Sequence, residues 1–197
     1  MGAPPVSTAA VTTDDPILDA ARATVLDFGI SRMTVSEVAR RAGVSRMTVY
    51  RRYPDGDALL KAVMAREFTQ TIALGLEANA EEPDACRRLV SEAMQALVLL
   101  LDNPVMRRLI EVDVDLLVPY FAVEAGRFQD AVIAQLTHEI QAGQRAGEIR
   151  AGDPGTMAET IELAFRGPVL ATHTLSGDRR ARVLRELETF LTRFLQP

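Results

Sequence analysis

The stretch TVSEVARRAGVSRMTVYRRY, residues 34–53, has the pattern of two short helices joined by a tight turn. Thr34 is a good N-cap and Glu37, three positions later, completes a capping-box pattern, so a helix is predicted to begin here. Gly43 is predicted to end that helix, because a residue without a Cβ readily adopts the left-handed conformation of a tight turn. Ser45 is predicted to cap the second helix. The stretch therefore predicts a helix-turn-helix.

The second helix of this motif has an apolar and a polar side. Val44 and Val49 are predicted to pack beneath the first helix, and the opposite side has too little apolar character to be core. Arginine can form two hydrogen bonds to the edge of a guanine, and threonine can also contact bases. Tyrosine and arginine can bind phosphates. A helix of this size fits the major groove of DNA. The alternative is a solvated helical corner with arginine on its surface. We expect base contacts from Arg46, Met47 and Thr48 and phosphate contacts from Thr34, Tyr50, Arg51 and Arg52, with Ser45 at the start of the helix.

The N-terminal part of the chain resembles the DNA-binding domain of the TetR family of bacterial regulators. The matching residues are Ile17, Ala20, Ala21, Phe28, Gly29, Thr34, Val35, residues 38–45, residues 48–53, Leu59 and Leu60. Beyond about residue 66 the resemblance is architectural, since the ligand domains of that family share a helical plan and little sequence. It implies a DNA-binding regulator whose helical body encloses a small apolar or amphipathic effector.

One position departs from the family pattern. The family usually carries a lysine near the start of its fourth helix, where it holds a DNA phosphate, and this chain has Gly56 there between two aspartates. Arg52 and Lys61 are the candidates to replace that contact.

Length and composition predict an all-α protein of two units. A chain of 197 residues with 48% hydrophobic content can bury a full core, and no strand pattern is evident. We expect a disordered tail at residues 1–13 and a three-helix DNA-binding domain with the helix-turn-helix at residues 14–56. A helical effector-binding and dimerisation domain is expected at residues 57–197, with about nine helices in the whole chain. The fourth helix is long and belongs to both units.

Charge and apolar runs constrain the partners. The net charge is −5, but residues 16–66 contain nine basic and five acidic side chains, so a basic end lies on an acidic body. The N-terminus lacks the pattern of a signal peptide, and no apolar run approaches the roughly 20 residues that cross a bilayer. We therefore expect a cytoplasmic protein that binds DNA and no membrane. The single Cys86 excludes an internal disulfide.

The last two helices are predicted to form the dimer surface. Their apolar positions recur at helical spacing, and a twofold protein needs two recognition helices about 34 Å apart to read a near-palindrome. The alternative is that these stripes are covered within one protomer. The positions are Met157, Ile161, Ala164, Phe165 and Val169 on one helix and Val183, Leu184, Leu187, Phe190, Leu191, Phe194 and Leu195 on the other.

The resemblance also implies an effector pocket in the body. Aromatic and methionine side chains at helical spacing more often form core than a binding site, so each assignment competes with plain packing. The candidates are Phe68, Met94, Met106, Ile110, Tyr120, Phe121, Phe128 and Phe165. Gly167 and Pro168 are predicted to kink the eighth helix, which would open space beside Phe165 or serve dimer geometry.

Other classes of function lack their sequence signals. No nucleophile motif and no glycine-rich phosphate loop is present, so no enzymatic activity and no cofactor are expected. The acids at 111, 113 and 115 are more typical of a helix start than of a metal site, and no metal is expected. The runner-up is a helical ligand-binding or protein-interaction module without DNA binding. The sequence predicts a transcriptional regulator, most simply a repressor that an effector releases from its operator, and leaves the operator, effector and target genes open.

Overall fold

A computed structural model describes residues 15–79, 81–112, 126–171, 174–175 and 177–197. Within these ranges the chain forms nine α-helices and one short 3-10 helix, which confirms the all-α prediction. The predicted disordered tail and the pocket candidates Tyr120 and Phe121 lie outside the described residues. The helices are α1 (Pro16–Phe28), α2 (Val35–Arg41), α3 (Arg46–Arg52), α4 (Gly56–Ala78), α5 (Ala85–Asp102), α6 (Pro104–Val112), α8 (Gly126–Ala146), α9 (Pro154–Ala171) and α10 (Gly177–Leu195).

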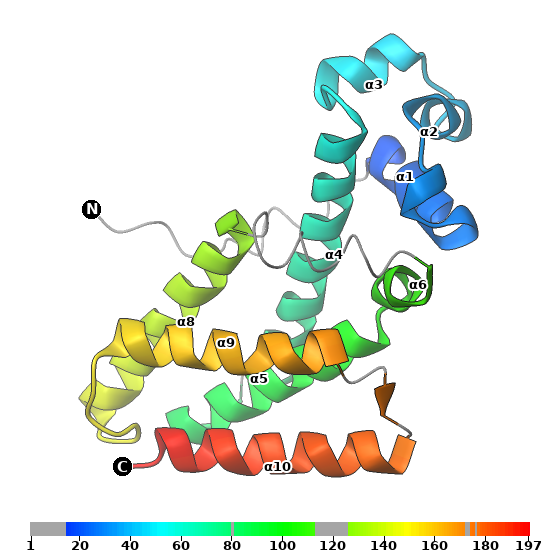
Figure 1. The fold of residues 1–197 in the computed structure, drawn as a ribbon. Coiled ribbons are helices and arrows are strands. Elements are labelled where there is room, and N and C mark those ends of the chain that lie inside the picture. Colours follow the sequence, from blue (N-terminus) through cyan, green and yellow to red (C-terminus); the bar gives the residue numbers. More distant parts are fainter. Residues whose placement is uncertain (1–14, 80, 113–125, 172–173, 176) are drawn as a thin grey trace.

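The long helix α4 connects the two ends of the molecule (Figure 1). Helices α1, α2 and α3 lie at one end of it, and α5, α8, α9 and α10 surround the other. At 1.5 Å per residue its 23 residues span about 34 Å. Helix α4 packs against both α1 and α5.

Side-chain caps set the helix starts at the N-terminal end. The carboxylate of Asp15 accepts from the backbone N–H of Ile17, and Pro16 occupies the first turn of α1. Thr34 caps α2 and Asp55 caps α4 in the same way, each accepting from the N–H three residues on. The start at Thr34 agrees with the sequence prediction, because a cap is a local interaction. The 3-10 turn at Ile30–Arg32 between α1 and α2 was not predicted.

Local interactions also set three further helix ends. Helix α5 begins at Ala85, because the carboxylate of Asp84 accepts from the N–H of Arg87 and makes Asp84 the N-cap. Helix α8 ends at Ala146, where Gly147 adopts a φ of 76°. Helix α3 ends at Arg52, and the N–H of Tyr53 donates to the carbonyl of Val49.

Helices α4 and α5 approach closely at Gly75. A Cβ at this position would lie 3.0 Å from the backbone nitrogen of Ala96 and 3.1 Å from the carbonyl oxygen of Glu92, so the absence of a side chain permits the approach. Gly75 thereby fixes the turn of α5 that carries Glu92.

The hydrophobic core extends from α1 to α10, and its largest fully buried side chains include Phe68, Met106 and Leu191.

None of the described helices is by itself long and apolar enough to span a membrane. The bent pair α5 and α6 meets the length and composition test only when the two are taken together.

Candidate nucleic-acid interface and ligand cavity

The turn between α2 and α3 is built by Gly43. Its φ of 67° is left-handed, and the N–H of the following Val44 donates to the carbonyl of Ala39, 3.0 Å away. Ser45 then caps α3 by accepting from the N–H of Thr48 at 3.1 Å. Val49 is fully buried and anchors α3 beneath α2, as the sequence predicted. The two short helices therefore hold a fixed angle, and the other side of α3 faces outward.

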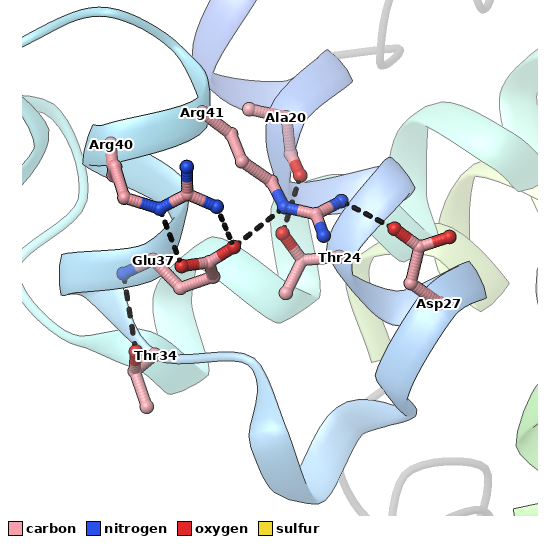
Figure 2. A network of polar contacts seen from close by, with 7 residues as sticks. All are labelled: Ala20, Thr24, Asp27, Thr34, Glu37, Arg40 and Arg41. Atoms are coloured by element: carbon pink, nitrogen blue, oxygen red, sulfur yellow. Dashed lines mark hydrogen bonds and ion pairs between the residues drawn. The ribbon is translucent and has the colours of Figure 1, made fainter.

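A cluster of ion pairs fixes α2 against α1 (Figure 2). The carboxylate of Glu37 accepts from Arg40 at 2.6 and 2.9 Å and from Arg41 at 2.7 Å. Arg41 also bridges to Asp27 on α1 at 2.7 Å, and its guanidinium lies over the ring of Phe28. The hydrogen bonds from Arg40 and Arg41 hold the pKa of Glu37 at about 2.

This cluster corrects one prediction. Thr34 caps α2 at 3.2 Å, but Glu37 does not reach back to complete the capping box. Its oxygens are occupied by the two arginines instead, because charged donors make stronger hydrogen bonds than a neutral N–H. Arg40 and Arg41 therefore pair with carboxylates within the domain.

The outward side of α3 carries two arginines that have no carboxylate partner among the described residues. Met47 is 74% exposed and Tyr50 46% exposed. Within the part of the chain that the structure describes, neither Arg46 nor Arg51 has a carboxylate partner, and Arg46 donates from Nη1 to the Ser36 hydroxyl at 3.5 Å. Two exposed guanidiniums without counterions attract anions.

Arg52, by contrast, lies back against α1. Its Nη1 is 3.2 Å from Asp15, which also accepts from the hydroxyl of Tyr53 at 2.8 Å. Burial and the hydrogen bond to Asp15 raise the pKa of Tyr53 to about 12. The contacts of Arg52 and Tyr53 join the end of α3 to the start of α1.

The start of α4 has a glycine at the position where the resemblance implies a phosphate-binding lysine. Gly56 is the first residue of the helix, and a Cβ there would meet no atom within 4 Å. Lys61, a candidate replacement, pairs with Asp57 at 2.7 Å.

A cavity of about 430 Å³ lies between α4, α5, α8 and α9. Its wall is mostly apolar, as is usual for a small-molecule site. Of the predicted pocket residues, Phe68 and Phe165 line it. Met94 and Met106 are buried in the core elsewhere, Ile110 packs against that core, and the side chain of Phe128 lies outside the described residues. Apolar spacing does not separate a cavity wall from a packed core, since both put the same residues on one helix face.

The cavity also contains charged groups that the sequence reading missed. Glu92 on α5 lines it and is only 8% exposed. Glu139 on α8 lines it too and pairs with Arg88 at 3.8 Å. On α9, Glu162 and Arg166 form a close pair at 2.7 Å. The signal for Glu92 was present in the sequence, because it is a charged residue on the apolar face of α5 between Leu89 and Ala96.

A buried carboxylate joins the DNA-binding end to the body. Glu67 of α4 is 3% exposed and accepts from Arg22 of α1 at 2.8 Å and from Asn103, at the end of α5, at 3.0 Å. One turn further along α4, the Thr71 hydroxyl donates to the carbonyl of Glu67 and lines the cavity. We call Glu67, Arg22 and Asn103 the seam. The seam and the cavity therefore share one turn of α4.

The stripe predicted as a dimer surface divides into two sets. Met157, Ile161, Val169, Leu191 and Leu195 are buried within the protomer. Val183 and Phe190 on α10 are 40% and 50% exposed. Leu163 on α9, which was not among the predicted positions, is 60% exposed.

Comparisons with known proteins agree with this geometry. Residues 17–63 match the family described as bacterial regulatory proteins, tetR family. An uncharacterized HTH-type transcriptional regulator of Mycobacterium bovis is 32% identical over 157 residues, which are 80% of each chain. The A-factor receptor protein of Streptomyces griseus is 28% identical over 88% of this chain and 60% of its own length. The crystal structure of a TetR-family regulator from Pectobacterium atrosepticum superposes with a TM-score of 0.74 at 18% identity, covering 91% of this chain and 92% of that one.

The fold and the outward α3 define a helix-turn-helix DNA-binding protein. The chain belongs to the TetR family of bacterial transcriptional regulators. It is a DNA-binding transcriptional regulator.

Proposed function

We propose that the protein is a dimeric repressor in the cytoplasm that leaves a near-palindromic operator when a small molecule enters the cavity. Residues 14–56 form the DNA-binding domain, and residues 57–197 bind the effector and the second chain. The observation that carries the DNA-binding site is the pair Arg46 and Arg51, which are exposed on α3 and have no carboxylate partner among the described residues.

The contacts with DNA divide into two kinds. Arg46, Met47 and Thr48 begin α3 and face outward or are half-buried, so they enter the major groove and contact base edges. Thr34, Tyr50 and Arg51 bind phosphates on either side of the groove, and Ser45 fixes the start of α3. Arg52 contributes to phosphate binding only if it leaves Asp15, so its share is smaller than that of Arg51.

Exposed apolar side chains on α9 and α10 support the dimer. Leu163, Val183 and Phe190 are exposed although they are large and apolar, and a second copy of the same pair of helices would cover them in a four-helix bundle. Twofold symmetry then presents two copies of α3 to successive turns of DNA.

Effector binding and DNA binding communicate through α4. Phe68 and Thr71 line the cavity, while Glu67 in the same turn holds α1 through Arg22. A molecule that moves this turn of α4 therefore moves α1 and changes the separation of the two α3 helices. Coupling of this kind is typically worth about 1–3 kcal/mol. The A-factor receptor protein among the relatives supports a small-molecule effector.

The test of the DNA-binding residues is a gel-shift titration across salt concentrations with DNA selected from a random pool. Arg46→Ala should cost about 1–3 kcal/mol on the selected site and relax base preference at one position. Arg51→Ala should weaken selected and random DNA alike and reduce the salt slope by about one. Arg87→Ala, an exposed arginine on α5, is the charge-matched control and should change neither. Equal losses on both DNAs for Arg46→Ala would contradict its role in base reading.

A further inference from the structure

Glu92 is the one charged group on the cavity wall whose partner is missing from the described residues. It is 8% exposed, and no described side chain or backbone group forms an ion pair or hydrogen bond with it. Glu139 has both Arg88 and the amide of Gln135, at 3.1 Å. A buried carboxylate without a partner costs free energy, so a ligand that supplies the partner has a large advantage.

The charges around Glu92 define what that partner must be. Arg88 of the same helix is held by Glu139 of α8, and on α9 Arg166 is held by Glu162. When Glu92 is ionised, the cavity wall therefore carries one negative charge that its own cations do not balance. Burial raises the pKa of Glu92 to about 7, with a further contribution from Glu139 that Arg88 opposes.

We propose that the cavity takes a lipophilic amine whose ammonium group lies between Glu92 and Glu139 and whose apolar body fills the space among α4, α5 and α8. Ile72, Leu76 and Leu97 provide the apolar wall on the α4 and α5 sides, and Val132 and Leu136 provide it on α8. A ligand carrying a carboxylate or phosphate would place a further negative charge beside the two glutamates. This identification rests on the proposed effector function and specifies the chemical class of the effector.

The test is calorimetric titration of the full-length protein without DNA. Decylamine, decanol and decanoate serve as probes, each kept below its aggregation concentration, because they share one chain length and differ only in the head group. Decylamine should bind most tightly. Glu92→Gln should weaken decylamine by roughly tenfold or more, because a charge-assisted hydrogen bond is lost, and should leave decanol unchanged. Glu77→Gln, an exposed carboxylate of α4 outside the cavity, is the matched control and should alter neither affinity.

A second readout does not depend on any variant. The ammonium group favours the ionised form of Glu92, so decylamine binding near pH 7 should release a proton, which titrations in buffers of different ionisation enthalpy detect. Decanol should release none. Binding of decanoate or decanol as tight as that of decylamine, or unchanged decylamine affinity in Glu92→Gln, would overturn the proposal.

Failure of the ligand class can be told apart from failure of the proposed function. If decylamine binds through Glu92 but leaves operator binding in a gel shift unaltered, the amine site stands and the effector role of the cavity fails. If decanoate or decanol binds more tightly than decylamine and releases the operator, the effector role stands and the amine assignment is refuted.

Discussion

The seam permits a charge-exchange experiment with a calculable outcome. Glu67 uses both carboxylate oxygens, one for Nε of Arg22 and one for Nδ2 of Asn103. Glutamine at this position has a single acceptor oxygen, so one of the two donors would face an amide NH₂. Losing one charge-assisted hydrogen bond at a site 3% exposed and weakening the other should cost Glu67→Gln about 2–3 kcal/mol. For a chain of this length that corresponds to about 5–10 °C in melting temperature.

The second substitution replaces Asn103, the donor in the hydrogen bond to Glu67. Asn103 uses Oδ1 to cap α6, accepting from the N–H of Val105 at 2.8 Å. Asn103→Asp keeps that cap but places a second carboxylate against Glu67, so alone it should cost about 2–4 kcal/mol. Combined with Glu67→Gln, the new aspartate can accept from the glutamine amide while the glutamine oxygen still accepts from Arg22.

The double variant should therefore lie within about 1 kcal/mol of the original protein, and the coupling energy should exceed about 3 kcal/mol. Urea denaturation followed by circular dichroism, at one fixed protomer concentration, measures all four proteins. Glu77→Gln controls for the loss of one charge and should stay within about 0.5 kcal/mol. Losses that simply add in the double variant would refute the assigned geometry of the seam.

Three further predictions concern phosphate binding and pH. Gly56→Lys has open space for its side chain and should tighten binding to all DNA sequences and steepen the salt slope by about 0.9 in a gel-shift series; an unchanged slope would exclude a phosphate at this position. Glu92 has a pKa of about 7 against an ordinary 4.5, so the folded state keeps a proton that the unfolded state releases, and stability should fall as pH rises from about 4.5 to 7. Glu92→Gln should remove that fall and raise the ligand-free protein's stability at pH 8 by about 1–3 kcal/mol in urea denaturation, whereas a pH profile parallel to the original would contradict the burial of this charge. Glu37 has a pKa of about 2, so its ion pairs stabilise the protein above about pH 4.5 and are lost as pH falls toward 2; Glu37→Gln should flatten this acid limb in thermal melts at stepped pH.

Local interactions explain what could be predicted from the sequence. Thr34, Ser45 and Asp55 each bond to an N–H three residues away, and Gly43 acts through its own backbone, so a short window contains all the information. The outward side of α3 follows from the burial of Val49 in the same window. The fold class and the DNA-binding element could therefore be predicted from the sequence.

Interactions between residues that are far apart in the sequence could not be predicted in this way. Arg22 and Glu67 are 45 positions apart, and nothing near either residue indicates the other. Met106 was expected at the pocket but is 1% exposed in the core, because periodicity gives the buried face without saying whether space remains beside it. Glu92 was overlooked although a charge within an apolar stripe is an anomaly that a single sequence reveals.

The seam has a practical consequence for engineering hybrid regulators. In a chimera with a foreign DNA-binding domain joined at residue 56, another residue would take the position of Arg22. Glu67 and Asn103 would then lack the arginine that pairs with Glu67. Such a chimera would contain the buried Glu67 carboxylate beside a residue that does not pair with it, regardless of how the two domains are joined. The exchanged segment should instead extend through Thr71 and include the residue at position 103. The residues at positions 22, 67 and 103 are then exchanged together, although they are far apart in the sequence.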